Sequence, residues 1–447
     1  MIETNKMREI KISSDSLVLS LLSLSNFAKV CILDACNDSY LNSHLLIAGI
    51  NPVETLQISG DDSEKTLESF NKKITQPNLA GIFTIAYDFG LKLEKMVVRK
   101  KEFSTFPEPD IFLALFDCLI IHDYSTRKTF LDGNCQKFDE IIKQLLSIKS
   151  NKKNNFDESV PRNINVKSNF SKKSYLQTIE KIQEYIRCGD TYQTNLTQQF
   201  LTELPDDLIA KKIFWRLKKD HPAPFSAYLN RIHDTVISAS PERFCTIKNQ
   251  TIFCSPVKGT RPRGKSQVED KFLKRQLLSS EKDRAENIMI VDLLRNDIGK
   301  ICEYGSIKVE KLCSLETHPT YHHLVSTIRG KLKYKMGFGE VIKAIFPCGS
   351  ITGAPKISTM QIIDLLETTN RGLSMGAIGY FGFDKALEMS VAIRTLVVRD
   401  NKAFFNVGGG IVIDSNPESE YEESLIKAQA IFSALGTDKT FVQLLNE

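Results

Sequence analysis

The 447-residue sequence predicts a fold of mixed α+β class, with a strand-rich, antiparallel first part and a second part in which helices and strands mix. Short apolar or alternating runs separated by turn residues predict strands at 29–34, 44–50, 81–88 and 111–122. Further strand-like runs between 236 and 257 surround a turn at 248–250. Apolar residues at helical spacing predict helices at 175–187, 281–296 and 418–435.

The ends of these helices carry local signals. Gly189 follows the helix at 175–187 and favours its termination. Asn416 offers a capping side chain to the helix at 418–435, and Pro417 suits the first turn, where its missing N–H costs nothing. The helix at 281–296 is apolar nearly all round beyond its charged start, so we expect it to be buried.

A segment rich in Lys, Asn and Ser divides the chain between residues 143 and 173. It holds few large apolar residues, and we interpret it as a surface linker or loop. The predicted organisation is therefore an N-terminal domain at 1–145, a linker or loop at 146–170 and a second domain at 171–447. We expect the two domains to pack as one intertwined unit.

Composition excludes several classes of protein. The net charge is 59 − 54 = +5 over 447 residues, too weak to argue for a nucleic acid or a membrane partner. No apolar run approaches the roughly 18 residues that span a bilayer. The start of the chain lacks a secretory signal, and the ten cysteines show no zinc-ligand spacing. We therefore expect a cytoplasmic protein with reduced cysteines.

One motif suggests a nucleotide enzyme. The stretch from Gly259 to Ser266, GTRPRGKS, satisfies the P-loop pattern G-x-x-x-x-G-K-S. However, Pro262 removes an N–H from the middle of the loop, and residues 267–274 form a highly charged segment with little strand to dock on. We interpret the match as chance, and a P-loop enzyme remains a remote alternative.

Paired carboxylates are a stronger signal. Asp283 and Glu286 lie three residues apart on one predicted helix, and Glu420 and Glu423 lie three apart on another, so each pair shares a helix face. Each pair alone is most simply a solvated face. If the two helices face each other, however, the four carboxylates need a cation, and their hard oxygen ligands suit Mg²⁺.

Two glycine-rich segments complete the pattern. They are FPCGSITGAPK at 346–356 and NVGGGI at 406–411, which contains Gly408, Gly409 and Gly410. Such glycines let the backbone approach an anion closely, although two tight turns would also explain them. Arg394 adds a fork suited to a carboxylate. Together these features predict a site for a small polyanion and Mg²⁺.

The order of the motifs resembles that of the chorismate-utilising enzymes. The segments are SASPERF (238–244), SPVKGTRPRG (255–264), KDRAENIMIVDLLRNDIG (282–299), HHLVSTIRG (322–330), FPCGSITGAPK (346–356), AIGYFGF (377–383), AIRT (392–395) and GGGIVIDSNPESEYEESLIKA (408–428). The resemblance runs from about Ser171 to the C-terminus, and GIFTIAYDFG (81–90) and PDIFLALFDCLIIHD (109–123) look like the family's first domain. The P-loop match falls inside one of these segments.

The resemblance implies a fold similar to anthranilate synthase component I. That is an α+β fold with large antiparallel sheets forming a sandwich flanked by helices. It also implies that 171–447 is the chorismate-binding catalytic domain and that 1–145 is the family's N-terminal domain.

Within the family, three segments resemble aminodeoxychorismate synthase component I. They are Pro256 to Thr260 (PVKGT), Asp190 to Leu196 (DTYQTNL) and Ala223 to Tyr228 (APFSAY). Anthranilate synthases usually have Ala at the position of Lys258. The resemblance implies conversion of chorismate and ammonia to 4-amino-4-deoxychorismate, toward 4-aminobenzoate and folate. Anthranilate synthase component I and a non-catalytic tryptophan-binding relative remain alternatives.

The resemblance also implies roles for individual residues. Lys258 would add covalently to the chorismate ring, with Glu242 as the general acid and His323 and Thr352 lining the ring. Glu286 and Glu423 would bind Mg²⁺ directly, and Asp283 and Glu420 would act through water. The ring carboxylate would be held by Lys427 and the backbone of Gly408, Gly409 and Gly410, and the enolpyruvyl carboxylate by Tyr380 and Arg394.

Partners and departures follow from the same comparison of motifs. The sequence shows no Gly-x-Cys-x-Gly nucleophile turn with a matching His-x-Glu, so we expect a separate glutamine amidotransferase subunit to supply ammonia. Tryptophan is a further candidate ligand, because Leu33 to Cys36 lies near where relatives hold it, although LDAC departs from their L-L-E-S. Cys348 replaces the usual Gly in the glycine-rich segment at 346–356 and could tighten the pocket.

Overall fold

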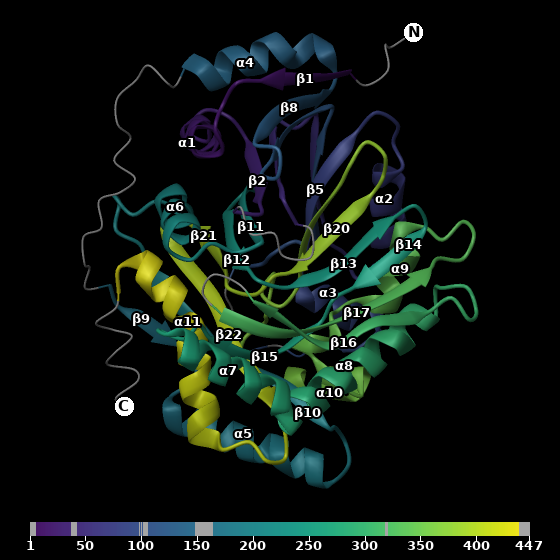
Figure 1. Cartoon of the computed structure of the whole chain (residues 1–447), viewed down its shortest axis with the longest axis vertical. Helices are drawn as coiled ribbons and strands as arrows, with labels where there is room; N and C mark the ends of the chain where they lie inside the picture. Colours follow the sequence, from purple (N-terminus) through teal and green to yellow (C-terminus); the bar gives the residue numbers. More distant parts are fainter. Residues whose placement is uncertain are drawn as a thin grey trace.

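Two large sheets form the centre of the molecule, with helices outside them (Figure 1). The computed structural model describes residues 6–36, 43–97, 99, 101, 106–147, 164–317 and 321–437. Within these residues one sheet has 12 strands and the other has 10, and neighbouring strands run antiparallel. The predicted α+β fold with large antiparallel sheets is confirmed.

The larger sheet joins a block of strands from the first third of the chain to a block of later strands. Its order is β1 (Lys6–Ile10), β8 (Lys128–Gly133), β7 (Cys118–Asp123), β3 (Leu45–Ile50), β2 (Val30–Asp34), β11 (Phe225–Asn230), β12 (Thr235–Ser240), β21 (Thr395–Arg399), β22 (Lys402–Ile411), β10 (Gln193–Glu203) and β18 (Gly353–Ala354), with β9 (Val166–Ser168) beside β10.

The smaller sheet does the same. Its order is β15 (Val257–Pro262), β17 (Tyr321–Lys331), β14 (Thr251–Cys254), β13 (Arg243–Lys248), β20 (Leu387–Val391), β19 (Ala377–Phe381), β5 (Ala80–Ile85), β6 (Ile111–Phe116) and β4 (Glu54–Ile58), with β16 (Lys308–Thr317) beside β17. Strands from before residue 145 therefore pair with later strands in both sheets: β2 with β11 and β5 with β19.

The helices are α1 (Ser14–Leu24), α2 (Ser63–Ile74), α3 (Tyr87–Leu93), α4 (Phe138–Ser147), α5 (Lys172–Arg187), α6 (Ala210–Asp220), α7 (Gln267–Ser279), α8 (Glu281–Gly299), α9 (Phe338–Ile345), α10 (Lys356–Leu366) and α11 (Pro417–Leu435). The three predicted helices correspond to α5, α8 and α11. Asn416 caps α11 as expected, because its Oδ1 accepts a hydrogen bond from the Ser419 N–H at 3.0 Å. Among the helices of the described residues, none is long and apolar enough to cross a bilayer.

Three segments differ from the sequence prediction. The predicted strand at 81–88 ends at Ile85, and Tyr87 begins α3. The predicted strand at 111–122 is two strands, because the chain passes from the smaller sheet to the larger one at Asp117, which pairs with Lys137 at 2.8 Å. Part of the predicted linker forms β9, and residues 148–163 of that linker lie outside the described residues.

Apolar side chains fill three layers. Between the sheets, residues such as Phe112 and Phe404 are buried. Helices α1, α4, α5, α6 and α11 cover the outer face of the larger sheet, and α2, α3, α8 and α9 cover that of the smaller one. Each long helix therefore presents a fixed face to a sheet, which sets the direction of the polar side chains at its end.

Candidate active site

Lys258 lies where the edge strand of the smaller sheet approaches β22 of the larger one, a place that we call the sheet-edge region. It belongs to β15, the edge strand of the smaller sheet, and its Nζ is 3.9 Å from Glu286 Oε2 on α8. A Cβ atom built on Gly410 of β22, in the larger sheet, would lie 3.3 Å from the same Nζ. The amine of Lys258 is therefore held near strands of both sheets, beside the helix α8, which carries acidic residues.

The glycines at 408–410 belong to strand β22 and do not form a tight turn. A Cβ on Gly409 would lie 3.3 Å from Glu420 Oε2 and 3.4 Å from Lys427 Nζ, and one on Gly410 would lie 2.3 Å from Gln193 Nε2. Side chains at these positions would fill the space beside charged groups. The strand thus offers bare backbone to a ligand on both faces.

The four carboxylates predicted to serve a metal all lie in this region, and each has a cation nearby. The N–O distances are 3.9 Å for Lys258–Glu286, 3.1 Å for Arg261–Asp283, 3.9 Å for Lys282–Glu420 and 2.8 Å for Lys427–Glu423. The Lys282–Glu420 pair joins α8 to α11, so the two helices face each other, which the sequence analysis could state only as a condition.

The environments of these carboxylates differ. Burial raises the pKa of Glu286, and nearby Asp283 and Glu420 raise it further, while Lys258 and Lys282 oppose the shift. In contrast, the pKa of Glu423 is lowered, chiefly by the adjacent Lys427. On α11, Glu423 therefore favours its charged form. On α8, an added cation would stabilise the charged form of Glu286, which burial disfavours.

These residues fit a lightly coordinated Mg²⁺ rather than a protein cage. Within the described ranges, no three His, Cys, Asp or Glu side chains gather closely enough to hold a metal. Mg²⁺ keeps several waters and takes one or two carboxylates directly, and Glu286 and Glu423 can supply these from opposite helices. The carboxylate oxygens present are also the ligand type that Mg²⁺ prefers.

Glu242 lies between β12 and β13, is 6% exposed and accepts a hydrogen bond from the Ser350 hydroxyl at 2.7 Å. Burial raises its pKa, and Ser350 and Lys258 oppose that shift. A carboxyl that keeps its proton to higher pH is suited to donate it. Cys348, the residue that departs from the family pattern, places its Sγ 3.3 Å from Ser350 Oγ, next to this acid.

His323 and Thr352 occupy different positions relative to Lys258. His323 pairs across β15 and β17 with Thr260, two residues from Lys258, and its ring stacks on Tyr321 with centroids 4.2 Å apart. The Thr352 hydroxyl donates to the carbonyl oxygens of Cys348 and Gly349, at 3.0 and 3.2 Å. Thr352 thus braces its own loop, and its hydroxyl proton points at that loop.

The structure does not bring Tyr380 and Arg394 together. Tyr380 pairs with Glu388 on β20 and lines a cavity of about 960 Å³ between the sheets, beside Arg243. Arg394 lies beyond the other end of β20, just before β21, where burial lowers the pKa of its guanidinium and Tyr321 opposes the shift. Tyr321 is therefore the tyrosine near Arg394, and the sequence analysis did not single it out.

Gln193 is a second residue that the sequence analysis did not single out. It is fully buried, and neither polar atom of its amide has a hydrogen-bond partner within the described residues. Its Nε2 lies 2.3 Å from the position of a Cβ on Gly410. Gln193 lies in the segment DTYQTNL, which the family resemblance had already marked. The spacing of residues in the sequence, however, does not show where its side-chain amide points.

The P-loop match does not form a phosphate cradle. The charged segment after it is the start of α7, so strand, loop and helix do follow in order. However, the Gly264 N–H donates to Asp270 Oδ1 at 3.0 Å, and the Lys265 N–H donates to Glu269 Oε2 at 2.7 Å. Carboxylates of the helix itself therefore occupy the amides that a phosphate would need.

Curated relatives include both activities considered above. An aminodeoxychorismate synthase component 1 of Bacillus subtilis is 34% identical over 83% of this chain and 80% of that protein. An anthranilate synthase component 1 of Aquifex aeolicus is 38% identical over 74% of this chain and 70% of that protein. The chain spans only 29% of a longer rice protein named "Probable aminodeoxychorismate synthase, chloroplastic", with 43% identity over 58% of this chain.

The fold also has solved counterparts. A crystal structure of anthranilate synthase component I from Streptococcus pneumoniae matches with a TM-score of 0.77 and 26% identity, covering 87% of this chain and 92% of that one. Residues 29–433 match the protein family described as chorismate binding enzyme. With the sheet-edge site and these matches together, the chain belongs to the chorismate binding enzyme family.

Proposed function

We propose that this chain converts chorismate and ammonia to 4-amino-4-deoxychorismate. The observation that carries the proposal is the position of Lys258, whose amine lies between the bare backbone of Gly410 and the carboxylate of Glu286. The sequence around it, PVKGT, resembles aminodeoxychorismate synthases, and curated relatives of that name cover most of this chain. A non-catalytic binding protein would have no need for a lysine in this place.

The proposed reaction needs a nucleophile and an acid. The Lys258 amine forms a bond to ring C2, the two conjugated ring double bonds shift from C1=C2 and C5=C6 to C1=C6 and C4=C5, and the C4–O bond breaks as Glu242 gives its proton to the departing hydroxyl. Ammonia then forms a bond at C4, both double bonds shift back, and the bond between Lys258 and C2 breaks. The sum is chorismate plus ammonia giving 4-amino-4-deoxychorismate and water.

Two carboxylates of chorismate need compensation. We assign the ring carboxylate to Lys427, whose Nζ donates to the Gly408 carbonyl at 3.1 Å, and to the backbone at 408–410. Mg²⁺ held by Glu286 and Glu423, with Asp283 and Glu420 acting through water, would neutralise and orient the same carboxylate when bound. We assign the enolpyruvyl carboxylate to Arg394.

Ammonia must come from elsewhere, and we propose a separate glutamine amidotransferase subunit as its source. The name "component 1" of the relatives agrees with a partner subunit. Tryptophan stays a prediction. Leu33, Asp34 and Ala35 line the cavity between the sheets, but the Asp34 carboxylate already pairs with Lys218 at 2.8 Å.

Anthranilate synthase is the second candidate function. It is favoured by the relative from Aquifex aeolicus and the structure from Streptococcus pneumoniae, which carry that name. Lys258 separates the candidates, because the sequence resemblance associates Ala at this position with the anthranilate enzymes.

The test is to incubate the purified chain with chorismate, Mg²⁺ and ammonium and to identify the product by mass. We expect 4-amino-4-deoxychorismate with no release of pyruvate. Anthranilate with one pyruvate per turnover would overturn the proposal in favour of the second candidate. Adding glutamine in place of ammonium should give no product until an amidotransferase subunit is supplied.

A further inference from the structure

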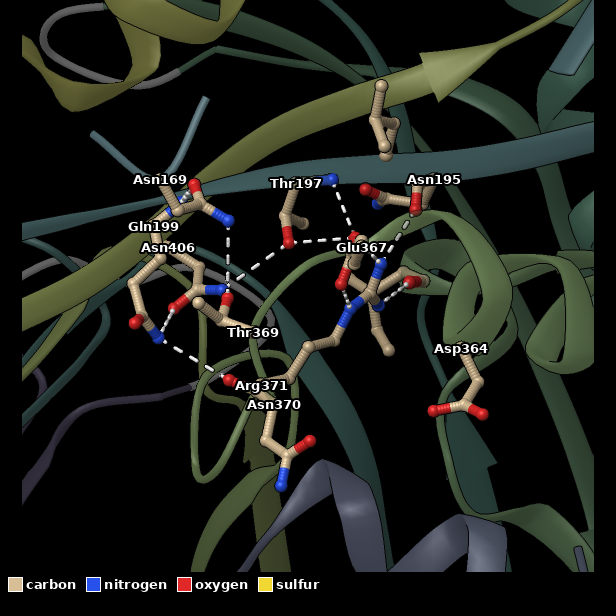
Figure 2. Close-up of polar contacts among 12 residues, drawn as sticks. Asn169, Asn195, Thr197, Gln199, Asp364, Glu367, Thr369, Asn370, Arg371 and Asn406 are labelled. Atoms are coloured by element: carbon tan, nitrogen blue, oxygen red, sulfur yellow. Dashed lines mark hydrogen bonds and ion pairs between the residues drawn. The ribbon is translucent and has the colours of Figure 1, made fainter. Parts of the chain in front are cut away.

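Arg371 and Glu367 form a buried ion pair behind the proposed site (Figure 2). They are 2% and 4% exposed. Glu367 Oε2 accepts a hydrogen bond from Arg371 Nε at 2.9 Å, and Oε1 accepts one from Nη2 at 2.7 Å. Both donors of one guanidinium edge therefore meet both oxygens of one carboxylate, the planar fork that only Arg can make.

The remaining hydrogen bonds of this pair reach two other segments, and a ring contact reaches a third. Arg371 Nη1 donates to the Ile351 carbonyl at 3.0 Å, and Nη2 donates to the Asn195 carbonyl at 2.7 Å. Glu367 Oε1 also accepts from the Thr197 N–H at 2.7 Å and from the Thr197 hydroxyl at 2.9 Å. The guanidinium lies 4.4 Å from the centre of the Tyr87 ring, which closes its other face.

Two of these segments border the proposed site. Ile351 precedes Thr352, and it follows Ser350, whose hydroxyl donates to Glu242. Asn195 pairs in register with Gly410, and its N–H donates to the Thr352 carbonyl at 2.7 Å. Through Ile351, Arg371 holds the loop whose Ser350 hydroxyl donates to the proposed acid, Glu242. Through Asn195, it holds the strand that pairs with Gly410, beside Lys258.

We propose that the Arg371–Glu367 pair is a positioning device for the proposed reaction. It holds the loop at 349–353 at a fixed distance from β10 and, through Asn195, from Gly410 of β22. Arg371 acts through backbone carbonyls and does not touch substrate. The inference rests on the proposed function only in that the site binds chorismate.

The cost of the arrangement supports a role beyond stability. A buried ion pair often contributes little more stability than apolar residues of the same volume, because both charges lose their hydration. Its advantage is geometric, since the fork and two further bonds fix three segments in one arrangement: 367–371, the loop at 349–353 and β10. A displacement of about 1 Å at a reacting centre can lower a rate by roughly 100-fold.

Arg371→Lys is the direct test. Lysine keeps the charge but cannot form the fork and reach both carbonyls. We expect the variant to fold and kcat/KM for chorismate to fall by about 10- to 100-fold, with kcat lowered at saturating chorismate. Calorimetric binding of chorismate with Mg²⁺ and without ammonia should weaken as well.

Arg231→Lys is the matched control. Arg231 is 1% exposed and forms a fork with Asp234 at 2.6 and 2.8 Å and a bond to Glu108 at 2.6 Å. Glu108 in turn accepts a hydrogen bond from the Leu373 N–H, so Arg231 supports the segment that holds Arg371. Within the part of the chain that the structure describes, the Arg231 side chain makes its hydrogen bonds to Asp234, Glu108 and Thr84 and none to Ile351, Asn195 or Thr197. We expect Arg231→Lys to lower Tm as much as Arg371→Lys and to leave kcat/KM unchanged.

The outcomes separate the inference from the proposed function. The product of the wild-type chain decides the function, and the two variants are then compared on whichever product forms. If Arg371→Lys keeps the wild-type kcat/KM, or if Arg231→Lys loses as much, Arg371 has no positioning role. If Arg371→Lys does not fold, Thr197→Val removes one hydroxyl bond to Glu367 without changing shape. An unchanged kcat/KM in Thr197→Val would then overturn the inference.

Discussion

The two sheets build two polar regions that differ in how tightly their charges are paired. In the cavity between the sheets, Arg243 donates from Nε at 2.8 Å and from Nη2 at 2.5 Å to one oxygen of Glu388. At the sheet edges, Lys258 and Glu286 lie 3.9 Å apart, as do Lys282 and Glu420. The cavity holds a direct, hydrogen-bonded pair, whereas these two edge pairs are too long for a direct hydrogen bond. The other two pairs of the edge region, Arg261–Asp283 at 3.1 Å and Lys427–Glu423 at 2.8 Å, are direct, so the contrast concerns Lys258 and Lys282.

This difference indicates which region carries the chemistry. A charge already paired at hydrogen-bond distance must break that contact before it can act on a ligand, and the cost is high where water is excluded. Charges 3.9 Å apart keep their attraction but leave hydrogen-bond donors and acceptors available to substrate and metal. The fully buried amide of Gln193 has the same character, because both its polar atoms lack partners within the described residues. The contrast therefore supports our proposal that the reactive amine is that of Lys258.

Loss of Lys258 should have the largest effect. In Lys258→Ala we expect kcat for aminodeoxychorismate formation to fall on the order of 10³-fold or more, because the covalent step is removed. Chorismate binding, measured by calorimetry, should change far less. Lys265→Ala is the control, since Lys265 is an exposed lysine seven residues later on the same segment. A Lys258→Ala variant that keeps its rate would show that the loosely paired lysine is not the nucleophile.

The acidic side of the sheet-edge region is tested by Glu420→Gln. Glu420 accepts a hydrogen bond from Ser415 at 2.6 Å and is predicted to reach Mg²⁺ through water. We expect the Mg²⁺ concentration for half-maximal rate to rise by about 10- to 100-fold, with kcat recovered at saturating Mg²⁺. Glu418→Gln, an exposed carboxylate in the same first turn of α11, should leave the Mg²⁺ requirement unchanged. Equal effects of the two variants would contradict the proposed metal site.

Much of the sheet-edge region could be predicted from the sequence, because its residues come from long local motifs. Helices α8 and α11 have strong apolar spacing and clear caps, so the shared face of Asp283 and Glu286 followed directly. That α8 and α11 face each other was only a condition. It depends on β15 and β22 lying in different sheets, and the pairing of distant strands leaves no trace in local spacing.

The directions of individual side chains were the least predictable. Thr352 lies in a glycine-rich motif, but its hydroxyl donates to the carbonyl oxygens of its own loop. From the sequence, the glycines at 408–410 are equally compatible with a tight turn and with a ligand-binding strand. The structure decides between them through neighbours from β10, β15 and α11, which are distant in the sequence. Helices α1 to α4, α6, α7, α9 and α10 were not predicted. The first four have short apolar patterns that lie among stronger strand signals.

The pH dependence of the proposed acid gives a smaller effect. As a general acid, Glu242 acts in its protonated form, and burial raises its pKa while the Ser350 hydrogen bond lowers it. Ser350→Ala removes the lowering contribution, so the pKa of Glu242 should rise further. We expect the alkaline limb of the kcat profile to move to higher pH relative to wild type.

The wild type and Ser350→Ala use the same substrate, ammonia, whose own protonation changes with pH in the same way for both. The difference between their pH profiles therefore reports the pKa of the acid in the enzyme. Ser279→Ala, at an exposed serine of α7, should reproduce the wild-type profile. A limb that moves to lower pH, or that stays in place, would mean that Ser350 does not act on the proposed acid.

The smallest effect is expected in the cavity, and it bears on a role that the sequence resemblance implied. Tyr380→Phe should leave kcat/KM for chorismate unchanged, because Tyr380 lies beside Arg243 and Glu388 and not beside Arg394. Arg394→Lys should lower kcat/KM by about 10- to 100-fold, the loss of one charge-assisted fork to a carboxylate. Steady-state kinetics of both variants decides between the two regions. If Tyr380→Phe loses as much as Arg394→Lys, the cavity belongs to the substrate site, and its paired charges must open when chorismate binds.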